Sequence, residues 1–410
     1  MSALTYTSLF PSRVFPLKGV FVKHRAAAVA QLLGEKPRVV APVPYFPNIS
    51  GFGEWSRMGS HPGEEELDGI RIWHPRYFMT PKLGMAIYGP SMYWASRGLV
   101  RRLFKERSFQ VLDAHFAYPD GLAAVLLGRM LGIPVVLTVR GNDINLSARF
   151  RTVRPLISFT LRHASAVVAV SESLADRAVS LGADPGNVRV VRNGVDTQLF
   201  RWMARAEARA SLGLPQSETV LISVGHLIPR KGFDLVLRAL GEGNEKTRGW
   251  RYAVIGDGPL RKDLDALAER MGISERVTFI GSLDQDRLAL WYSASDLVVV
   301  PSRREGTPNV LMEALASGVP VVGSRVDGIP EVLRPEEDGL LFEAEDVSGL
   351  RMAIRSALKR RWDREAISRR NSVRGWEKAA EETVAVFERV RRMRCRSEER
   401  GTEPMQSPIA

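Results

Sequence analysis

The chain has 410 residues, a formal net charge of +12 at pH 7, 45% hydrophobic residues and 25% charged residues. One hydrophobic core seldom supports a chain of this length, so two domains are expected. Every apolar run of membrane-spanning length is interrupted by a charge or a helix breaker, which argues against a spanning helix. The N-terminus has neither the basic lead nor the apolar core of a signal peptide, so a cytoplasmic protein is expected.

The basic excess is concentrated in the first half of the chain. Residues 1–200 contain 24 Lys and Arg against 14 Asp and Glu, whereas residues 201–410 contain 34 against 32. This surplus fits plain solubility, or a positive face that steers the protein toward anionic lipid headgroups. The chain has no helix-turn-helix, zinc-finger or RNA-binding signature, so nucleic acid is not expected as a partner. Its single cysteine, Cys395, excludes an intrachain disulfide.

Short apolar runs alternate with stretches of helical periodicity, which is the pattern of parallel sheets wrapped by helices. In the first half, the expected strands cover residues 39–43, 110–115, 135–139, 166–170 and 188–191. In the second half, they cover residues 219–224, 252–255, 277–280, 297–300 and 319–322. Residues 61–68 are expected to form a surface loop and residues 194–200 a linker. A charged amphipathic stretch at 362–393 precedes residues 394–410, whose polar and proline-containing sequence predicts a disordered tail.

The segment from Tyr77 to Val100 is rich in aromatic residues and Met. It can be interpreted as a membrane-dipping segment or a lid over the acceptor. The alternative is a partly buried helix pair, because Met and aromatic side chains usually fill cores.

The strand expected at 297–300 is followed by a polar loop and a second helical pattern. Thr307 can cap this helix with Pro308 at its first position, so the amides of Asn309 and Val310 would point toward a phosphate. The sequence therefore predicts a diphosphate site at this helix start.

Two carboxylates flank the same helix start. Glu305 lies on the loop beside Gly306, and Glu313 lies about one and a half turns into the helix. Recognition of hydroxyl groups explains such anions near a diphosphate, because a carboxylate only accepts hydrogen bonds and a polyol offers donors. One carboxylate can accept from sugar hydroxyls and the other from ribose hydroxyls, which predicts a nucleotide-sugar site.

The spacing of Glu305 and Glu313 resembles the signature of the retaining glycosyltransferases of family four. In the second half, residues 223–232, 254–259 and 277–283 also resemble that family's loops, in the family's order. In the first half, residues 114–121, 137–144 and 192–196 resemble a subgroup that includes teichuronic-acid-type transferases. The resemblance covers residues 8–390.

The resemblance implies an α/β fold of GT-B architecture, with two Rossmann-like domains that face each other across a cleft. The acceptor domain would cover residues 1–196 and the donor domain residues 197–375, and a helix at 376–393 would cross back to the first domain. It implies a retaining glycosyltransferase that moves a sugar from a nucleoside-diphosphate sugar, with uridine as the commoner base. The acceptor would be a saccharide or lipid-linked saccharide in cell-surface polysaccharide or glycoconjugate synthesis, at the inner face of the cytoplasmic membrane.

Fixed positive charge near the leaving diphosphate is expected to be the largest catalytic contribution. By the resemblance, Arg230 and Lys231 take the diphosphate oxygens, whereas they would otherwise form a solvated basic turn. Many relatives carry Arg where this chain has His226, which weakens one phosphate contact at neutral pH. The resemblance assigns catalysis to His115, Glu305, Arg230 and Lys231. It assigns donor binding to Gly19, Gly225, His226, Arg230, Lys231, Gly256, Ser282, Leu283, Glu305, Gly306, Thr307, Pro308, Asn309, Val310 and Glu313.

The resemblance also implies roles at two strand ends of the first domain. His115 would face the sugar, with a buried structural histidine as the alternative. Arg140, Asn142 and Asp143 are assigned to the acceptor side, and Asp143 could instead cap a helix.

No cofactor and no metal are expected. Asp284 and Asp286 have the Asp-x-Asp form that metal-dependent glycosyltransferases of another fold use, but a helix begins directly after them and capping explains Asp284 better. Retention comes from the resemblance, which implies front-face attack with the departing phosphate oxygen taking the proton. Two alternatives stay open: a catalytically silent nucleotide-sugar-binding scaffold subunit, and a sugar-nucleotide epimerase of similar architecture.

Overall fold

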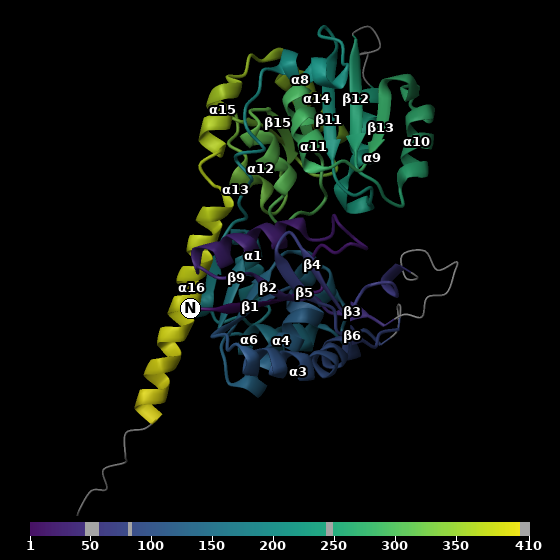
Figure 1. The fold of residues 1–410 in the computed structure, drawn as a ribbon. Helices are drawn as coiled ribbons and strands as arrows, with labels where there is room; N and C mark the ends of the chain where they lie inside the picture. Colours follow the sequence, from purple (N-terminus) through teal and green to yellow (C-terminus); the bar gives the residue numbers. More distant parts are fainter. Residues whose placement is uncertain (46–56, 81–83, 243–248, 402–410) are drawn as a thin grey trace, which may run out of the picture. The chain divides into compact units, whose positions relative to one another are not determined.

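The computed structural model describes residues 1–45, 57–80, 84–242 and 249–401, with side chains as far as Cys395. The chain divides into two compact units (Figure 1). Unit 1 comprises residues 1–193 and 376–410, and unit 2 comprises residues 194–375. This division places the expected linker at the start of unit 2.

Unit 1 is built on an eight-stranded sheet. In spatial order its strands are β10 (Val188–Val190), β9 (Ala166–Ala169), β8 (Val135–Val139), β7 (Val111–His115), β1 (Ala3–Tyr6), β2 (Arg38–Val40), β5 (Ile70–Trp73) and β4 (Glu64–Leu67). Neighbouring strands are parallel except β4 and β5. A separate short pair consists of β3 (Val43–Pro44) and β6 (Arg76–Tyr77). The strand order reverses between β1 and β7, so their carboxyl ends form the topological switch point where ligands bind in such sheets.

Helices cover both faces of this sheet (Figure 1). One face packs against α3 (Tyr88–Glu106), α4 (Leu122–Leu131), α6 (Arg154–His163) and α7 (Glu172–Ser180), and the other against α1 (Val20–Leu32) and α16 (Trp376–Gly401). Side chains alternate between the faces, as the two-residue period of a strand requires. In β7, for example, Leu112 and Ala114 pack toward α3 and α4, whereas Val111 packs toward α1 and α16.

Unit 2 is built on a six-stranded, fully parallel sheet. In spatial order its strands are β13 (Val277–Gly281), β12 (Trp250–Ile255), β11 (Thr219–Val224), β14 (Leu297–Val300), β15 (Val321–Ser324) and β16 (Gly339–Phe342). This is the order of a doubly wound nucleotide-binding sheet, with its switch point between β11 and β14.

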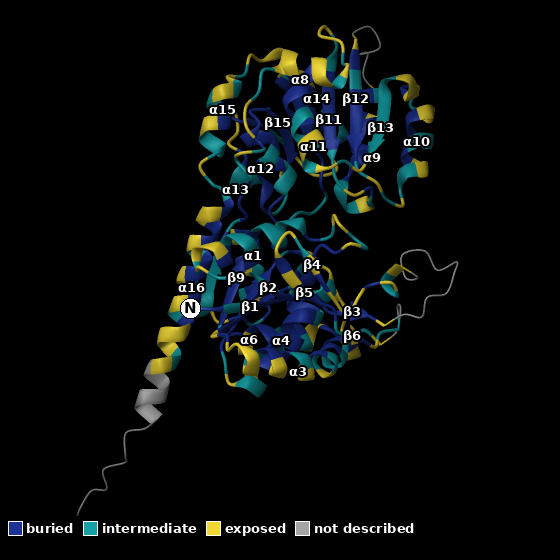
Figure 2. Cartoon of the chain, in the orientation of Figure 1, coloured by how far each residue is buried: buried dark blue, intermediate teal, exposed yellow. Residues whose placement is uncertain are grey.

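The helices of unit 2 again form two layers, and Figure 2 shows the buried strands between them. One layer contains α9 (Phe233–Gly241), α10 (Arg261–Arg270) and α14 (Val347–Lys359). The other contains α11 (Gln285–Ala294), α12 (Asn309–Ala316), α13 (Ile329–Val332) and α15 (Arg364–Asn371), while α8 (Arg205–Leu212) packs on α11. The expected α/β fold with two parallel sheets is confirmed.

Several elements differ from the sequence-based expectations. β1 was missed, although it is central, because its sequence Ala-Leu-Thr-Tyr lacks the Val- and Ile-rich run that marks the predicted strands. Residues 61–68 do not form a simple surface loop, because they contain the edge strand β4, in which Glu65 is buried and accepts a hydrogen bond from His74 Nε2 at 2.8 Å. α16 continues to Gly401, beyond the expected end at residue 393, because Arg and Glu favour helix. The remainder of the expected disordered tail, residues 402–410, lies outside the described residues.

The aromatic segment at 77–100 forms β6, a 3-10 turn at Met85–Ile87 and most of α3. Its residues 81–83 lie outside the described part of the chain. Tyr88 and Met92 are buried, whereas Trp94 is 59% exposed. No helix within the described residues combines the length and the apolar character needed to cross a membrane.

The switch point of unit 2 requires a glycine. Gly232 begins α9 with φ +69°, and a Cβ atom there would lie 2.0 Å from the carbonyl oxygen of Pro301, the residue after β14. The loops that follow β11 and β14 therefore touch through backbone, and any side chain at residue 232 would force them apart.

We expect Gly232→Ala to destabilise unit 2 more than Gly213→Ala, as measured by urea unfolding. Gly213 has nearly the same conformation, φ +66°, but a Cβ atom there would have nothing within 4 Å. In both variants the alanine must adopt a left-handed backbone conformation, which costs about 1 kcal/mol of stability. Gly232→Ala should cost about 1–3 kcal/mol more, because the clash is with backbone. If both variants lost the same stability, a Cβ atom at residue 232 would be accommodated without strain against the Pro301 backbone.

Candidate functional site

The candidate site lies at the carboxyl ends of β11 and β14. The loop after β11 contains the 3-10 turn η5 (Pro229–Lys231), and the loop after β14 covers residues 301–308. Arg303 donates its backbone N–H to the carbonyl of Arg230 at 2.8 Å, and Arg230 Nη1 donates to the carbonyl of Arg304 at 2.9 Å. Arg303 also forks onto Asp234, with two bonds of 2.8 Å. These contacts fix the two loops against each other.

Glu305 is the centre of the charged cluster. Its Oε2 lies 2.6 Å from Lys231 Nζ, 3.2 Å from Arg230 Nη1 and 3.1 Å from Ser302 Oγ. The exposed fractions of the Glu305 and Lys231 side chains are only 11% and 12%. Burial alone would raise the pKa of Glu305, but the Lys231 and Arg230 cations outweigh it and hold the pKa below its ordinary value. The sequence-predicted cations and carboxylate are therefore brought together as an ionised cluster.

Asp327, which the sequence interpretation missed, fixes the backbone of this loop. Its Oδ2 accepts the N–H of Glu305 at 2.8 Å, and its own φ is +43°. Asp327 follows β15, the next strand beyond β14. The rule that functional groups follow strand ends would have included it.

Glu313 lies on α12 in a different environment. Tyr292 Oη, on α11, donates to Glu313 Oε2 at 3.0 Å. Burial raises the pKa of Glu313 to about 7, while Tyr292 and the more distant Lys231 oppose that shift. The sequence interpretation also missed Tyr292, because an aromatic residue within a helical pattern is usually interpreted as a core residue.

The start of α12 differs from the prediction. Pro308, not Thr307, is the N-cap: its backbone is extended, with φ −74° and ψ 112°, and its carbonyl accepts from the amide of Leu311 at 3.1 Å. A proline has no side-chain oxygen, so the N-cap residue makes no side-chain bond to the first turn. Asn309 and Val310 remain the first two helical residues, whereas Gly306, Thr307 and Pro308 are buried.

The other predicted donor residues follow β11, β12 and β13. His226 is exposed, and its Nδ1 donates to the carbonyl of Asp257 at 2.5 Å. Gly225 and Gly256 approach so closely that a Cβ at Gly256 would lie 2.0 Å from the Gly225 oxygen, which gives Gly256 a packing role. Ser282 is exposed and Leu283 half-buried after β13.

In unit 1, His115 ends β7 and is fully buried. Its Nδ1 lies 3.0 Å from Arg140 Nη2, and its Nε2 lies 3.3 Å from Asp113 Oδ2. Burial, with Arg140 beside the ring, lowers the pKa of His115 to about 4 although Asp113 opposes the shift. The ring is therefore neutral, and both of its nitrogens face protein groups. A sugar contact by His115 would require its release from Arg140.

The expected acceptor-side residues separate into different environments. Asp143 is fully buried and accepts the amides of Ala117 at 2.9 Å, Gly141 at 2.8 Å and Arg140 at 3.1 Å. It therefore ties together the loops after β7 and β8, and its acceptor-side role stays a prediction. Arg140 Nη1 donates to Asn193 Oδ1 at 3.0 Å. Asn142, the first residue of α5 (Asn142–Asn145), is exposed.

Two other predicted residues have local structural roles. Gly19 precedes α1 with φ +69°, and a Cβ there would lie 2.3 Å from the Leu9 carbonyl oxygen. Asp284 caps α11 by accepting the amide of Arg287 at 2.8 Å, so the capping interpretation is confirmed. Across the described ranges, no three His, Cys, Asp or Glu side chains are grouped so as to hold a metal ion.

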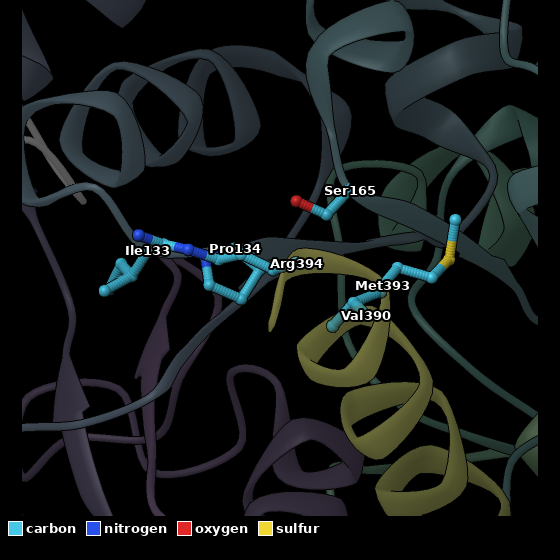
Figure 3. Close-up of a pocket in the computed structure, with 6 residues that line it drawn as sticks. All are labelled: Ile133, Pro134, Ser165, Val390, Met393 and Arg394. Carbon is cyan, nitrogen blue, oxygen red and sulfur yellow. The ribbon is translucent and has the colours of Figure 1, made fainter. Parts of the chain in front are cut away.

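A hollow of ≈ 340 Å³ in unit 1 is lined by Ile133, Pro134, Ser165, Val390, Met393 and Arg394 (Figure 3). Ile133 and Pro134 precede β8, and Ser165 precedes β9. The hollow therefore lies at the amino ends of strands, opposite the edge at which such sheets bind ligands. We do not place the functional site there.

Comparison with known proteins gives matches in both units. The family described as "Glycosyltransferase Family 4" matches residues 56–199, and the family described as "Glycosyl transferases group 1" matches residues 204–374. N-acetyl-alpha-D-glucosaminyl L-malate synthase of Bacillus anthracis is 30% identical over 60% of this chain and 64% of its own length. D-inositol 3-phosphate glycosyltransferase 2 of Catenulispora acidiphila is 36% identical over 65% of this chain and 61% of its own length. The chain thus spans less than two thirds of the length of these two relatives.

Longer matches extend over nearly the whole chain. The putative teichuronic acid biosynthesis glycosyltransferase TuaC of Bacillus subtilis is 28% identical over 86% of this chain and 88% of its own length. HepE of Anabaena in complex with UDP has a TM-score of 0.71 at 17% identity, over 95% of this chain and 100% of that structure. Sucrose-phosphate synthase from Thermosynechococcus elongatus has a TM-score of 0.70 at 20% identity, over 97% of this chain and 98% of that structure. The two sheets with their switch-point loops, together with these matches, show that the chain belongs to the family-four glycosyltransferases of GT-B fold.

Proposed function

We propose that this protein is a retaining glycosyltransferase that moves a sugar from a nucleoside-diphosphate sugar to a saccharide or lipid-linked saccharide acceptor. Surface polysaccharide or glycoconjugate synthesis is the setting we propose, and a UDP-sugar is the proposed donor. The observation that carries the proposal is the convergence of Arg230, Lys231 and Glu305 at the switch point of unit 2. The relatives' printed names support sugar transfer but contain different compounds: L-malate, D-inositol 3-phosphate and teichuronic acid.

The charged cluster suits a leaving diphosphate. Arg230 and Lys231 both direct their positive charge at the single carboxylate of Glu305, so two cations stand where an anion could replace it. A diphosphate that approaches Lys231 competes with Glu305 for the same ammonium group. Glu305 would then be released to accept hydrogen bonds from the sugar hydroxyls, while both cations stabilise the charge that develops on the leaving group.

Glu313 and the start of α12 suit the nucleoside part of the donor. The Glu313 carboxylate lies more than one helix turn beyond the loop that holds Glu305. It can accept hydrogen bonds from ribose hydroxyls. HepE, which shares the fold, was solved with UDP, so uridine nucleotides are the first ligands to test. No cofactor is proposed, and the departing phosphate oxygen is proposed to take the acceptor's proton.

We expect Glu305→Gln to separate binding from transfer. Loss of its charge frees Lys231 and Arg230 for the diphosphate, so UDP should bind at least as tightly as to the native protein. Cleavage of the donor should fall about a hundredfold, because the contact to the reacting sugar is lost. Thermal unfolding against UDP-, GDP-, ADP- and dTDP-sugars measures binding, and release of nucleoside diphosphate measures cleavage.

Glu313→Gln is the matched control for that experiment. It should weaken binding instead, and so remove the stabilisation of about 2.7 kcal/mol that a ligand at a hundred times its Kd provides. If no sugar nucleotide stabilises the native protein, the proposed function is wrong. Binding without cleavage in the native protein would favour the silent scaffold.

We propose on the basis of the same cluster that donor cleavage needs no metal ion. Because Arg230 and Lys231 can neutralise the diphosphate, donor cleavage should be unchanged in EDTA. Activity that is lost in EDTA and restored by Mg²⁺ or Mn²⁺ would contradict this assignment.

We also propose that unit 1 contacts anionic membrane through one face of α3. Trp94 is 59% exposed, and the guanidinium of Arg97 lies 3.9 Å from its ring centroid. Arg101, Arg102 and Lys105 are exposed on the same helix. An exposed tryptophan among cations fits the interface of an anionic bilayer, because the ring prefers the headgroup region and each cation adds attraction.

Charge reversal tests this contact. The double variant Arg101→Glu with Arg102→Glu should lose at least tenfold in sedimentation with phosphatidylglycerol vesicles, since each basic residue contributes about 1 kcal/mol. Lys262→Glu with Arg270→Glu, on α10 of unit 2, is the matched control. Equal binding by both variants, or equal binding of the native protein to neutral phosphatidylcholine vesicles, would contradict the proposal.

A further inference from the structure

The carboxylate of Glu313, on α12, is held by a hydrogen bond from a residue of a different helix. Tyr292, on α11, is fully buried, and its Oη donates to Glu313 Oε2 at 3.0 Å. Its ring packs edge-on against Phe200, with ring centroids 5.8 Å apart and an angle of 70°. A tyrosine side chain has few torsions to fix, so this packing and the hydrogen bond together place its hydroxyl rigidly.

We propose that Tyr292 is a positioning residue for donor binding, which keeps the Glu313 carboxylate ionised and oriented to receive the ribose hydroxyls of the nucleotide. This inference rests on the proposed function, because it concerns the same site. Tyr292 itself does not touch the ligand. Tyr292 anchors the Oε2 atom of Glu313. Among the described residues no group forms a hydrogen bond with Oε1, so this second oxygen is left for the ligand.

The environment of Glu313 explains why it needs this donor. Its helix neighbours Leu311, Met312, Ala314 and Leu315 are buried apolar residues. An apolar setting disfavours a carboxylate, and burial raises the pKa of Glu313 to about 7. A protonated carboxyl carries a hydroxyl donor in place of one acceptor oxygen, so it accepts less well from ribose hydroxyls. The Tyr292 hydroxyl opposes protonation, because a phenol at neutral pH stabilises an anion that accepts from it.

Other charged groups around α12 are placed differently. From η5, Lys231 lowers the pKa of Glu313 through its charge, but its ammonium is bonded to Glu305. From α15, the Arg364 guanidinium donates to the carbonyls of Ser293, Ser295 and Gly318. From α13, Glu331 does not contribute to the shift of Glu313. Tyr292 is therefore the group that contacts the carboxylate directly.

The direction of the pH dependence follows. A ligand whose hydroxyls donate to Glu313 prefers the ionised carboxylate, so affinity is low when Glu313 is protonated and rises as the pH increases through about 7. Removing the Tyr292 hydroxyl raises the pKa of Glu313 further. The rise in affinity should then move to higher pH, while affinity at alkaline pH should approach that of the native protein.

The test compares Tyr292→Phe with the native full-length chain by calorimetric titration, with UDP-glucose, GDP-mannose and ADP-glucose as probes. The diphosphate of a sugar nucleotide does not titrate near neutral pH, so a change there reports the protein. We expect about tenfold weaker binding for Tyr292→Phe at about pH 6.5, the loss typical of one hydrogen bond to a charged group. At about pH 9, where both proteins carry the carboxylate, the difference should shrink to about threefold or less.

Tyr252→Phe is the matched control. Tyr252 is equally buried, but it belongs to the core on the opposite face of the unit 2 sheet. Its variant should bind like the native protein at both pH values. A 2′,3′-dideoxyribose analogue of the bound probe should bind Tyr292→Phe and the native protein alike, because it has no hydroxyl for Glu313.

The possible outcomes separate the two proposals. If none of the probes binds the native protein, the proposed function fails and this inference fails with it. If the native protein binds and Tyr292→Phe binds equally at both pH values, only the role of Tyr292 is overturned. A loss that is the same at both pH values, or that persists with the analogue, would show a merely structural role for Tyr292.

Discussion

The ion pair between Lys231 and Glu305 is the contact on which the architecture of the unit 2 site depends. It joins the loops after β11 and β14, whose residues are 74 positions apart in the chain. A buried ion pair gains little stability unless further hydrogen bonds satisfy both partners, because each ion loses its hydration. Here Arg230 and Ser302 bond the same carboxylate oxygen, and Asp327 holds the Glu305 amide. Residues that follow three strand ends therefore converge on one residue, Glu305.

The two glutamates of the site show how environment divides the roles of identical side chains. Glu305 faces two cations, and its pKa stays low although it is buried. Glu313 has one neutral donor in direct contact, and burial raises its pKa to about 7. Glu305 is thus held as an anion by its neighbours, whereas Glu313 is an acceptor whose charge depends on its surroundings. Carboxylates with separated pKa values commonly take separate tasks in one site.

The sequence was most informative where a strand end coincides with polar residues. The strands that lead to Arg230 and Glu305 were predicted from their Val- and Ile-rich runs, and the doubly wound order then brings those two residues together. β1 escaped because its sequence Ala-Leu-Thr-Tyr lacks such a run, although pairing with β7 and β2 places it at the centre of the sheet. Tyr292 escaped for another reason: its role is defined by a tertiary contact with Glu313, which leaves no pattern in a single sequence. Asp327 follows the end of β15, so the same strand-end reasoning could have found it. Pro308 as N-cap likewise depends on one backbone torsion.

The buried cluster in unit 1 limits what His115 can do. The Arg140 guanidinium can only donate hydrogen bonds, so Nδ1 of His115 must accept from it. The proton of the neutral ring therefore lies on Nε2, toward Asp113. Protonation of Nδ1 would set two donors against each other in a buried site, which agrees with a pKa near 4. In this arrangement His115 supplies neither a proton nor a positive charge at neutral pH. In the reaction proposed above, the electrostatic work of stabilising a departing diphosphate would therefore fall to Arg230 and Lys231, which Glu305 holds in place in this structure.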